Sequence, residues 1–221
     1  MRGLINTAES LIIGPTIEPL DLVETKKALR FAQTAEDTLI DVWISAARQH
    51  FEEQTGRQLI SAIWEYWLDE APLEQREIEL PHPPLRDVVS VVYDDANGDE
   101  QTFDAANYRV IAPAGPLCTR GRIVLVAGAA WPIVQADRPK GLRIRFTAGY
   151  GATPGDVPEL VRGALYFLVG HFHNNRSETH EGSRTAGLEQ IPLGFATIVR
   201  GFKYSALPTL APQSSFIGGL R

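Results

Sequence analysis

The period of the hydrophobic residues changes twice along this 221-residue chain. Residues 21–58 have apolar positions at helical spacing, residues 59–148 alternate with a period of two, and residues 149–203 return to helical spacing. Helices and strands present their side chains with these two different periods. The order predicts an α+β fold, a small helical bundle with an inserted antiparallel β region that resembles a sandwich or barrel.

The first helical segment begins at recognisable capping residues. Asp21 is followed three residues later by Glu24, and Thr34 by Asp37, and both pairs are typical of a helix start. We expect residues 21–58 to form an antiparallel helical hairpin. Its long second helix should pack against the first helix after the β region.

The β region is predicted to contain seven short strands, separated by turns rich in Pro, Gly and Asn. Because no helix lies between them, we expect consecutive strands to pair antiparallel. The expected strands are 61–70, 77–80, 88–93, 101–103, 108–111, 122–126 and 142–146.

Three further segments lack periodicity. Residues 1–20 contain Pro15 and Pro19 and are expected to form an extended arm. Residues 174–190, between the C-terminal helices of the bundle, are polar and typical of a mobile loop. Residues 204–221 are rich in Pro, Ser and Gly and are typical of a flexible tail.

The charge of the chain argues against a protein that grips nucleic acid. It carries 21 Lys and Arg against 27 Asp and Glu, a formal net charge of −6. The acidic surplus lies in residues 1–138, with 12 basic and 22 acidic residues, whereas residues 139–221 have 9 and 5. Affinity for duplex DNA comes mainly from cations that displace counterions at phosphates. This balance is compatible with a protein past which DNA merely slides.

Motifs for secretion, membrane insertion and metal binding are missing from the sequence. No apolar run approaches the roughly 18 residues of a membrane span, so we expect the protein to be made in a cytoplasm. The single cysteine, Cys118, excludes an internal disulfide and a thiolate cluster. His171 and His173 point in different directions on a helix and cannot share one ion. We expect no metal and no cofactor.

One glycine-rich turn, from Gly149 to Gly155, joins a strand to a helix, as many nucleotide-binding sites do. A phosphate-binding loop places Lys and then Ser or Thr at the helix start, whereas this chain has Asp156 and Val157 there. A carboxylate at this position repels an anion. We interpret the turn as a tight connection, and a nucleotide- or small-molecule-binding enzyme that uses it is the alternative.

Several large apolar residues have no predicted place in the core. Alternate residues of a strand face opposite sides, so Ile63 and Trp67 face away from the core if Trp64 faces it. Trp131 adds to this exposed surface. Such a surplus is typical of a subunit that contacts copies of itself or other partners. We therefore expect Ile63, Trp67 and Trp131 to lie at a subunit interface.

The order of these segments resembles the head-tail connector (adaptor) proteins of long-tailed bacteriophages and gene transfer agents. The resemblance covers residues 19–203 and rests on stretches such as "AEDTLIDVWISAARQHFEEQTGRQLI", "WEYWLDEAP", "LRIRFTAGYG" and "VPELVRGALYFLVGHFHNNR". None of these stretches is a catalytic motif. The sequence does not distinguish a phage protein from one of a gene transfer agent.

The resemblance implies a structural virion protein and not an enzyme. Adaptors of this family form a twelvefold ring beneath the portal, at the neck of the capsid, which extends the DNA channel and offers a platform for the stopper or tail. The implied partners are further copies of the chain, the portal protein, the stopper or tail-joining protein, and double-stranded DNA that passes without specific binding; no membrane is implied. The implied location is the portal vertex of a virion made in the host bacterial cytoplasm. Another neck protein, such as a stopper, is the alternative within this class.

The C-terminal end of the chain combines basic and apolar residues. No acidic residue follows Glu189, whereas Arg200, Lys203 and Arg221 are basic. We expect this end to order on binding the portal or a neighbouring subunit, because burial of apolar side chains offsets the cost of ordering. The apolar residues of the tail are Phe216, Ile217 and Leu220.

Overall fold

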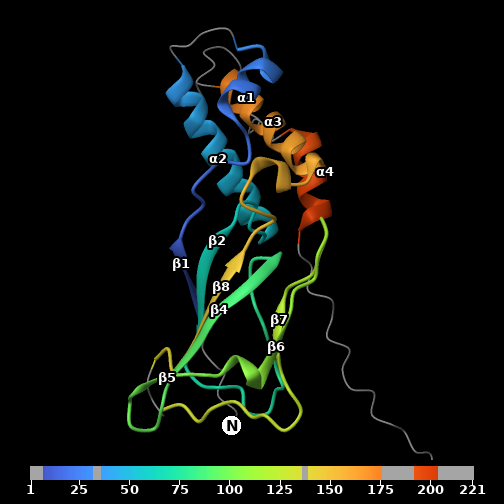
Figure 1. Cartoon of the computed structure of the whole chain (residues 1–221). Helices are drawn as coiled ribbons and strands as arrows, with labels where there is room; N and C mark the ends of the chain where they lie inside the picture. Colours follow the sequence, from blue (N-terminus) through green and yellow to red (C-terminus); the bar gives the residue numbers. More distant parts are fainter. Residues whose placement is uncertain (1–6, 32–35, 136–138, 176–191, 204–221) are drawn as a thin grey trace, which may run out of the picture.

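The computed structural model describes residues 7–31, 36–135, 139–175 and 192–203. A helical part lies at one end of an elongated molecule and the strands lie at the other (Figure 1). The helices are α1 (Leu22–Leu29), α2 (Asp37–Thr55), α3 (Glu159–Asn174) and α4 (Leu193–Phe202). The chain enters the β part after α2 and returns to the helices before α3. The predicted α+β class, with an antiparallel β region inserted into a bundle, is confirmed.

The capping residue predicted for α1 has its expected role. The Asp21 side chain accepts a hydrogen bond from the backbone N–H of Glu24 at 3.0 Å, which satisfies an amide that the helix leaves free. An ion pair between Lys26 and Asp37 joins α1 to α2. Thr34, the other predicted cap, lies outside the described residues.

The bundle core forms between α2, α3 and α4. Ile40, Ile44 and Phe51 of α2 are almost completely buried and share one apolar cluster with Leu165 of α3 and Phe195 of α4. The predicted packing of α2 against the helix that follows the β region is therefore confirmed. These positions repeat at three to four residues, so one side of α2 supplies the core and the other side stays exposed.

All seven predicted strands are present, in two antiparallel sheets. The first sheet has five strands in the order β1-β2-β8-β4-β5, and the second has three in the order β3-β7-β6. The two sheets bury a common apolar cluster, as in a sandwich. The strands are β1 (Thr7–Ile13), β2 (Ala62–Leu68), β3 (Glu77–Glu79), β4 (Leu85–Asp94), β5 (Glu100–Thr102), β6 (Tyr108–Ile111), β7 (Arg122–Leu125) and β8 (Leu142–Ala148).

The predicted pairing of consecutive strands is only partly right. It holds for β4 with β5 and for β6 with β7, but β8, the last strand, lies between β2 and β4. Leu142, Ile144, Phe146 and Ala148 of β8 are fully buried. A strand whose inner face is entirely apolar is buried most completely at the centre of a sheet. The alternation of its residues does not indicate which strands lie beside it.

The segment expected to be an extended arm contains β1, an edge strand that was not predicted from the sequence. β1 pairs with β2 from Thr7 opposite Leu68 to Ile13 opposite Ile63. A side-chain contact also holds it, because Oε1 of Glu9 lies 3.1 Å from Nε2 of His82. β1 therefore continues the sheet and is anchored to the turn before β4.

Acid should weaken the attachment of β1. The polar contact with His82 holds the pKa of Glu9 below its ordinary value of 4.5, although partial burial opposes this. The carboxylate therefore stabilises the folded chain above that value, and the contribution is lost as the pH falls through the lower pKa of the folded state. Protection factors from amide hydrogen exchange should decrease for β1, but not for β8, between about pH 6 and about pH 3.

The variant Glu9→Gln is the control for this measurement, because its amide does not titrate. Its β1 amides should have similar protection at both pH values. An equal acid-induced loss of protection in Glu9→Gln and in the unmodified chain would show that another group controls the strand.

Candidate interaction surfaces

The glycine-rich turn after β8 uses its own backbone amides for contacts within the chain. The N–H of Gly149 donates to the carbonyl of Pro84 at 2.9 Å, and the N–H of Tyr150 donates to that of Leu59 at 3.0 Å. Gly149 has a φ of 128°, and a Cβ atom there would lie 2.7 Å from the backbone N of Ser61. Glycine is needed at this position for a close backbone crossing.

The start of the following helical turn is filled by a carboxylate. Oδ2 of Asp156 accepts hydrogen bonds from both the N–H and the hydroxyl of Thr153, each at 2.8 Å, and the hydroxyl bond is the main reason why the pKa of Asp156 is lowered. A Cβ atom on Gly151 would lie 2.2 Å from Cγ of Asp156. Asp156 thus closes a short 3₁₀ turn, Pro154–Asp156, within the chain, and α3 begins three residues later, at Glu159, with Pro158 as its N-cap.

The histidines on α3 contact neighbouring side chains. The ring of His173 stacks on Phe31 at 3.9 Å between centroids, and Nδ1 of His171 lies 2.9 Å from Nδ2 of Asn175. Within the described ranges, no group of three or more His, Cys, Asp or Glu side chains is arranged to hold a metal ion. None of the helices in the described part of the chain is long and apolar enough to cross a membrane.

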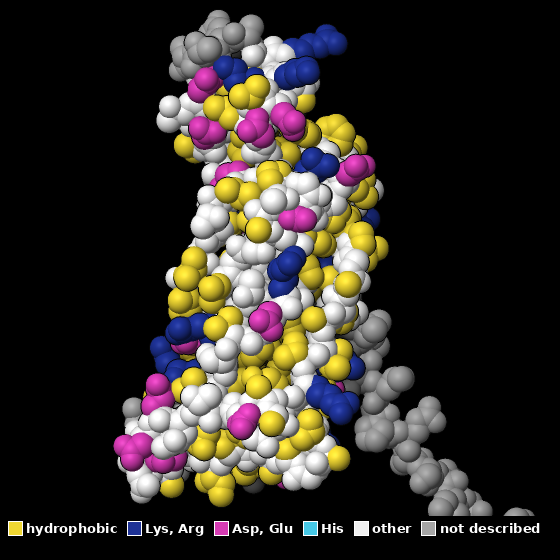
Figure 2. Space-filling view, in the orientation of Figure 1, with side chains coloured by type: hydrophobic (Ala, Val, Ile, Leu, Met, Phe, Trp, Pro, Cys, Tyr) yellow, Lys and Arg dark blue, Asp and Glu magenta, His cyan; other side chains and the backbone are white. Residues whose placement is uncertain are grey.

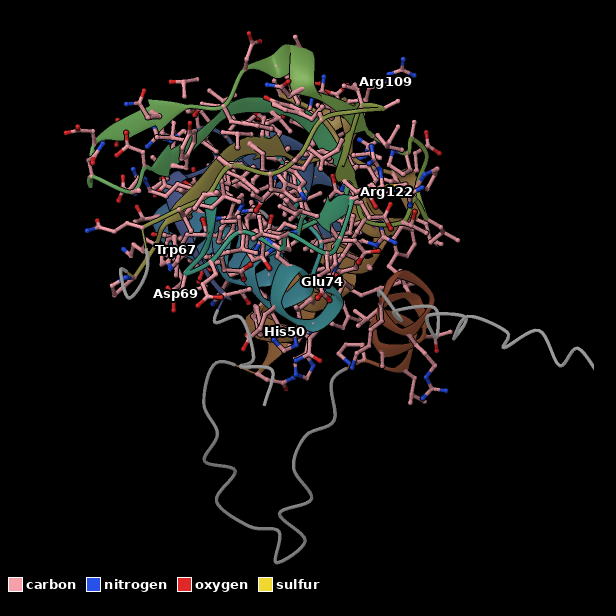
Figure 3. All side chains as sticks on the ribbon, turned by 90° about the horizontal axis from the view of Figure 1, so that it is seen from below. His50, Trp67, Asp69, Glu74, Arg109 and Arg122 are labelled. Carbon is pink, nitrogen blue, oxygen red and sulfur yellow. The ribbon has the colours of Figure 1, made fainter. Side chains whose placement is uncertain are left out.

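Trp67 lies on the outer side of β2, as expected, and Ile63 is also only partly buried. The ammonium group of Lys140 lies 4.1 Å from the centroid of the Trp67 ring, in a cation–π contact. Seen from below, Trp67 and Asp69 lie together on one side of the β part, and Arg109 and Arg122 lie on the opposite side (Figure 3). Trp67 thus remains a surface aromatic residue suited to a contact.

Trp131 is not on the surface, so that expectation is wrong. Only 4% of this residue is exposed. Its indole N–H donates to the carbonyl of Gln75 at 2.7 Å, and its ring contacts Phe103 at 5.6 Å between centroids. A Trp can enter a core when its N–H finds a carbonyl. The residues around Trp131 have no strand or helix period that would indicate the direction of the side chain.

The basic residues predicted to bind a partner lie at the exposed end of α4. Arg200 and Lys203 border a groove of about 280 Å³ whose other sides come from His50 and Gln54 of α2, with the buried ring of Phe195 among its lining residues. The groove is thus lined by apolar surface and basic groups. The other predicted binding residues, Phe216, Ile217, Leu220 and Arg221, lie outside the described residues.

A buried arginine, which sequence reasoning missed, ties the end of α4 to the β part. Arg57 is 3% exposed, its Nε donates to the carbonyl of Phe202 at 2.7 Å, and its Nη1 lies 3.7 Å from Sγ of Cys118. Beside it, the hydroxyl of Tyr150 donates to the carbonyl of Pro116 at 2.6 Å, and burial raises the pKa of Tyr150 to about 12. The segment between β6 and β7 reaches up to the end of α4 (Figure 1). We call this group of contacts the junction.

Further exposed apolar residues were not predicted as contact sites. Hydrophobic side chains gather beside β1 on one side of the molecule and over α4 on the other (Figure 2). Exposed fractions are 52% for Ile13 of β1, 57% for Val42 of α2, 54% for Phe167 of α3 and 78% for Leu193 of α4. Because a monomer rarely leaves this much apolar surface in water, these faces are candidate interfaces.

The fold is similar to that of chains in particles called gene transfer agents (GTAs). A chain in the neck of an empty GTA particle, computed with C6 symmetry, has a TM-score of 0.70 and 22% identity, and the match covers 90% of this chain and 97% of the other. A chain in the virion of a native GTA particle has a TM-score of 0.67 and 23% identity over 90% and 96% of the two chains. A chain in the neck of a native GTA particle, computed with C12 symmetry, has a TM-score of 0.62 and 22% identity over 93% and 97%.

These likenesses establish the fold of the chain along almost its whole length. No protein-family model matches the sequence, and no curated protein is significantly similar to it. The chain therefore has the fold of a protein found in gene transfer agent particles, and the resemblance inferred from its sequence is confirmed at the level of the fold.

Loss of the buried guanidinium should loosen the junction. In Arg57→Ala the carbonyl of Phe202 loses its donor, and a buried polar group left without a partner costs about 1–3 kcal/mol. We expect a lower free energy of unfolding in urea and faster amide exchange in the last turn of α4. Arg109→Ala, which removes an exposed arginine from β6, should change neither; equal effects of the two substitutions would contradict the assigned role of Arg57.

Proposed function

We propose that this protein is a structural, non-enzymatic subunit of the neck of a phage-like particle, a head-tail connector (adaptor) located at the portal vertex. The observation that carries the proposal is the likeness to neck chains over 90% of this chain and 97% of its counterpart. Such coverage means that the whole fold is shared, including both the bundle and the inserted sheets. The presence of α1 and α2 between β1 and β2 favours an adaptor over a stopper, which is expected to lack this opening helical hairpin.

The adaptor assembles as a ring of identical copies, which we expect to be twelvefold. The related neck structures were computed with C6 and C12 symmetry, and both symmetries are compatible with twelve copies. Closed rings of one chain require contacts between two different faces of each copy. The exposed apolar residues on β1, α2 and α4 supply surface of this kind.

The acidic balance of the chain suits a channel for DNA. A net charge of −6 gives few sites that would hold phosphates, and each neutralising contact would slow a sliding duplex. DNA is therefore expected to pass through the ring without specific binding. The portal protein on one side and a stopper or tail-joining protein on the other are the expected further partners.

A purified chain should form closed oligomers of one size. Mass photometry of the full chain, alone and with the portal ring of the same particle, should show a species of about twelve copies. An enzyme that used the Gly149 to Gly155 turn would stay small, and nucleotide would raise its melting temperature. A chain that stays small under both conditions, or that is stabilised by nucleotide, contradicts the proposal.

The tail is expected to bind the portal or a neighbouring subunit. Replacement of Phe216, Ile217 and Leu220 together by Ser should weaken binding to the portal ring by about tenfold or more, because apolar burial no longer offsets the ordering cost of the tail. Surface plasmon resonance measures this, with Ser205→Ala as the matched control. Unchanged affinity in the triple variant, or after deletion of residues 205–221, would exclude this role.

A further inference from the structure

The outer side of α2 is apolar and acidic. Leu39 and Val42 are 42% and 57% exposed, and Glu53 lies exposed near the C-terminal end of the helix. Val42 and Ala46, with neighbouring polar residues, line a hollow of about 360 Å³ on this side. We call Leu39, Val42, Ala46 and Glu53, with this hollow, the α2 face.

The outer side of α4 is apolar and basic. Leu193 is 78% exposed, and Phe167 of α3, which is 54% exposed, lies against Gly194, since a Cβ atom there would be 3.4 Å from the ring. Arg200 and Lys203 are exposed near the other end of the helix. We call Phe167, Leu193, Arg200 and Lys203 the α4 face. In Figure 1, α2 runs down one side of the bundle and α4 down the other.

The charges of the two faces are opposite. α4 contains no acidic residue. Arg48 is the single Lys or Arg of α2, and it is held within the subunit by Glu18 at 2.7 Å and Glu52 at 2.8 Å. Two copies of the α2 face would repel each other, as would two copies of the α4 face, whereas one of each would attract. This pattern favours a head-to-tail contact over a two-fold dimer.

The two faces also lie at matching levels along the bundle. The Phe51 ring of α2 lies 6.2 Å from that of Phe195 and 6.0 Å from that of Phe202, so it is level with the middle of α4. Both helices run downward in Figure 1. Glu53, two residues after Phe51, is therefore level with Arg200, which lies two residues before Phe202.

The apolar parts of the faces match in the same way. Phe51 is level with a point midway between Phe195 and Phe202 of α4. Ala46, five residues before Phe51, is therefore level with the first turn of α4, which begins at Leu193. The hollow around Ala46 is thus at about the level of Leu193. A rotation about an axis roughly parallel to these helices keeps every residue at its own level. It would therefore bring the exposed Leu193 of one copy to the hollow of the next.

We propose that the ring forms when the α4 face of one copy packs against the α2 face of the next copy, with Leu193 in the hollow beside Val42 and Ala46 and with Arg200 opposite Glu53. This inference rests on the proposed function, because it names the surfaces that a ring of this chain uses. The contact is heterologous and repeats around the ring, so each copy contributes both faces.

Charge reversal at both faces tests this pairing. In the full-length chain, Glu53→Lys places Lys against Arg200 of the next copy, and Arg200→Glu places Glu against Glu53. Each variant alone should form about tenfold fewer closed oligomers by mass photometry, because like charges then face each other across every contact. An equimolar mixture should restore closed oligomers in which the two variants alternate, since every contact then joins opposite charges.

Matched controls separate this effect from a general effect of charge. Glu70→Lys and Arg109→Glu make the same changes at exposed positions of the β part and should assemble like the unmodified chain. All four variants should keep the melting temperature of the unmodified chain, because the residues are exposed. Variants Glu53→Lys and Arg200→Glu that assemble normally, or a mixture no better than its components, would overturn the pairing.

Different results contradict the pairing of the two faces and the proposed function. If the unmodified chain forms closed oligomers and the four variants do so equally, the pairing of the α2 and α4 faces is wrong and the proposed function stands. If the unmodified chain forms no closed oligomer, alone or with the portal ring, the proposed function fails and this inference fails with it.

Discussion

The central position of β8 is the constraint on which the rest of the structure depends. β8 pairs with β2 on one side and with β4 on the other, and its inner residues from Leu142 to Ala148 are fully buried. The chain crosses close to Ser61 at Gly149 and then continues toward α3. β8 thus joins β2 to β4 at the centre of the large sheet and contributes side chains to the core shared with the small sheet. Its C-terminal end also sets the position from which the chain continues to α3. The junction at Arg57 adds a second connection, from α4 to the β part.

Much of the fold could be predicted from the sequence because the two hydrophobic periods are clear. The strands, the N-cap of α1 and the packing of α2 on α3 follow from local spacing. The position of β8 between β2 and β4 could not be predicted, because alternation does not specify a partner. β1 was missed because Leu11, Ile12 and Ile13 are consecutive apolar residues without alternation, and the strand is recognisable only once its partner β2 is known.

The candidate surfaces were less predictable than the fold. The outward direction of Trp67 follows from alternation along β2, whereas Trp131 lies in a segment without a period and proved to be buried. The burial of Arg57 could not be predicted, because the sequence around an arginine in a polar turn does not indicate whether its side chain is exposed or buried. The basic end of α4 was predicted from composition, but the face that Arg200 shares with Leu193 and Phe167 appears only when α3 and α4 are placed together. The proposed function, a subunit of a particle neck, depends on such faces.

Electron cryomicroscopy of the particle made by the cells that encode this chain tests the account most directly. The account predicts a ring of this chain at the neck, directly beneath the portal, in which α4 of each copy contacts α2 of the next around a central channel. A reconstruction in which the neck is built without this chain, or in which the chain is found elsewhere in the cell as an unassembled monomer, would contradict it.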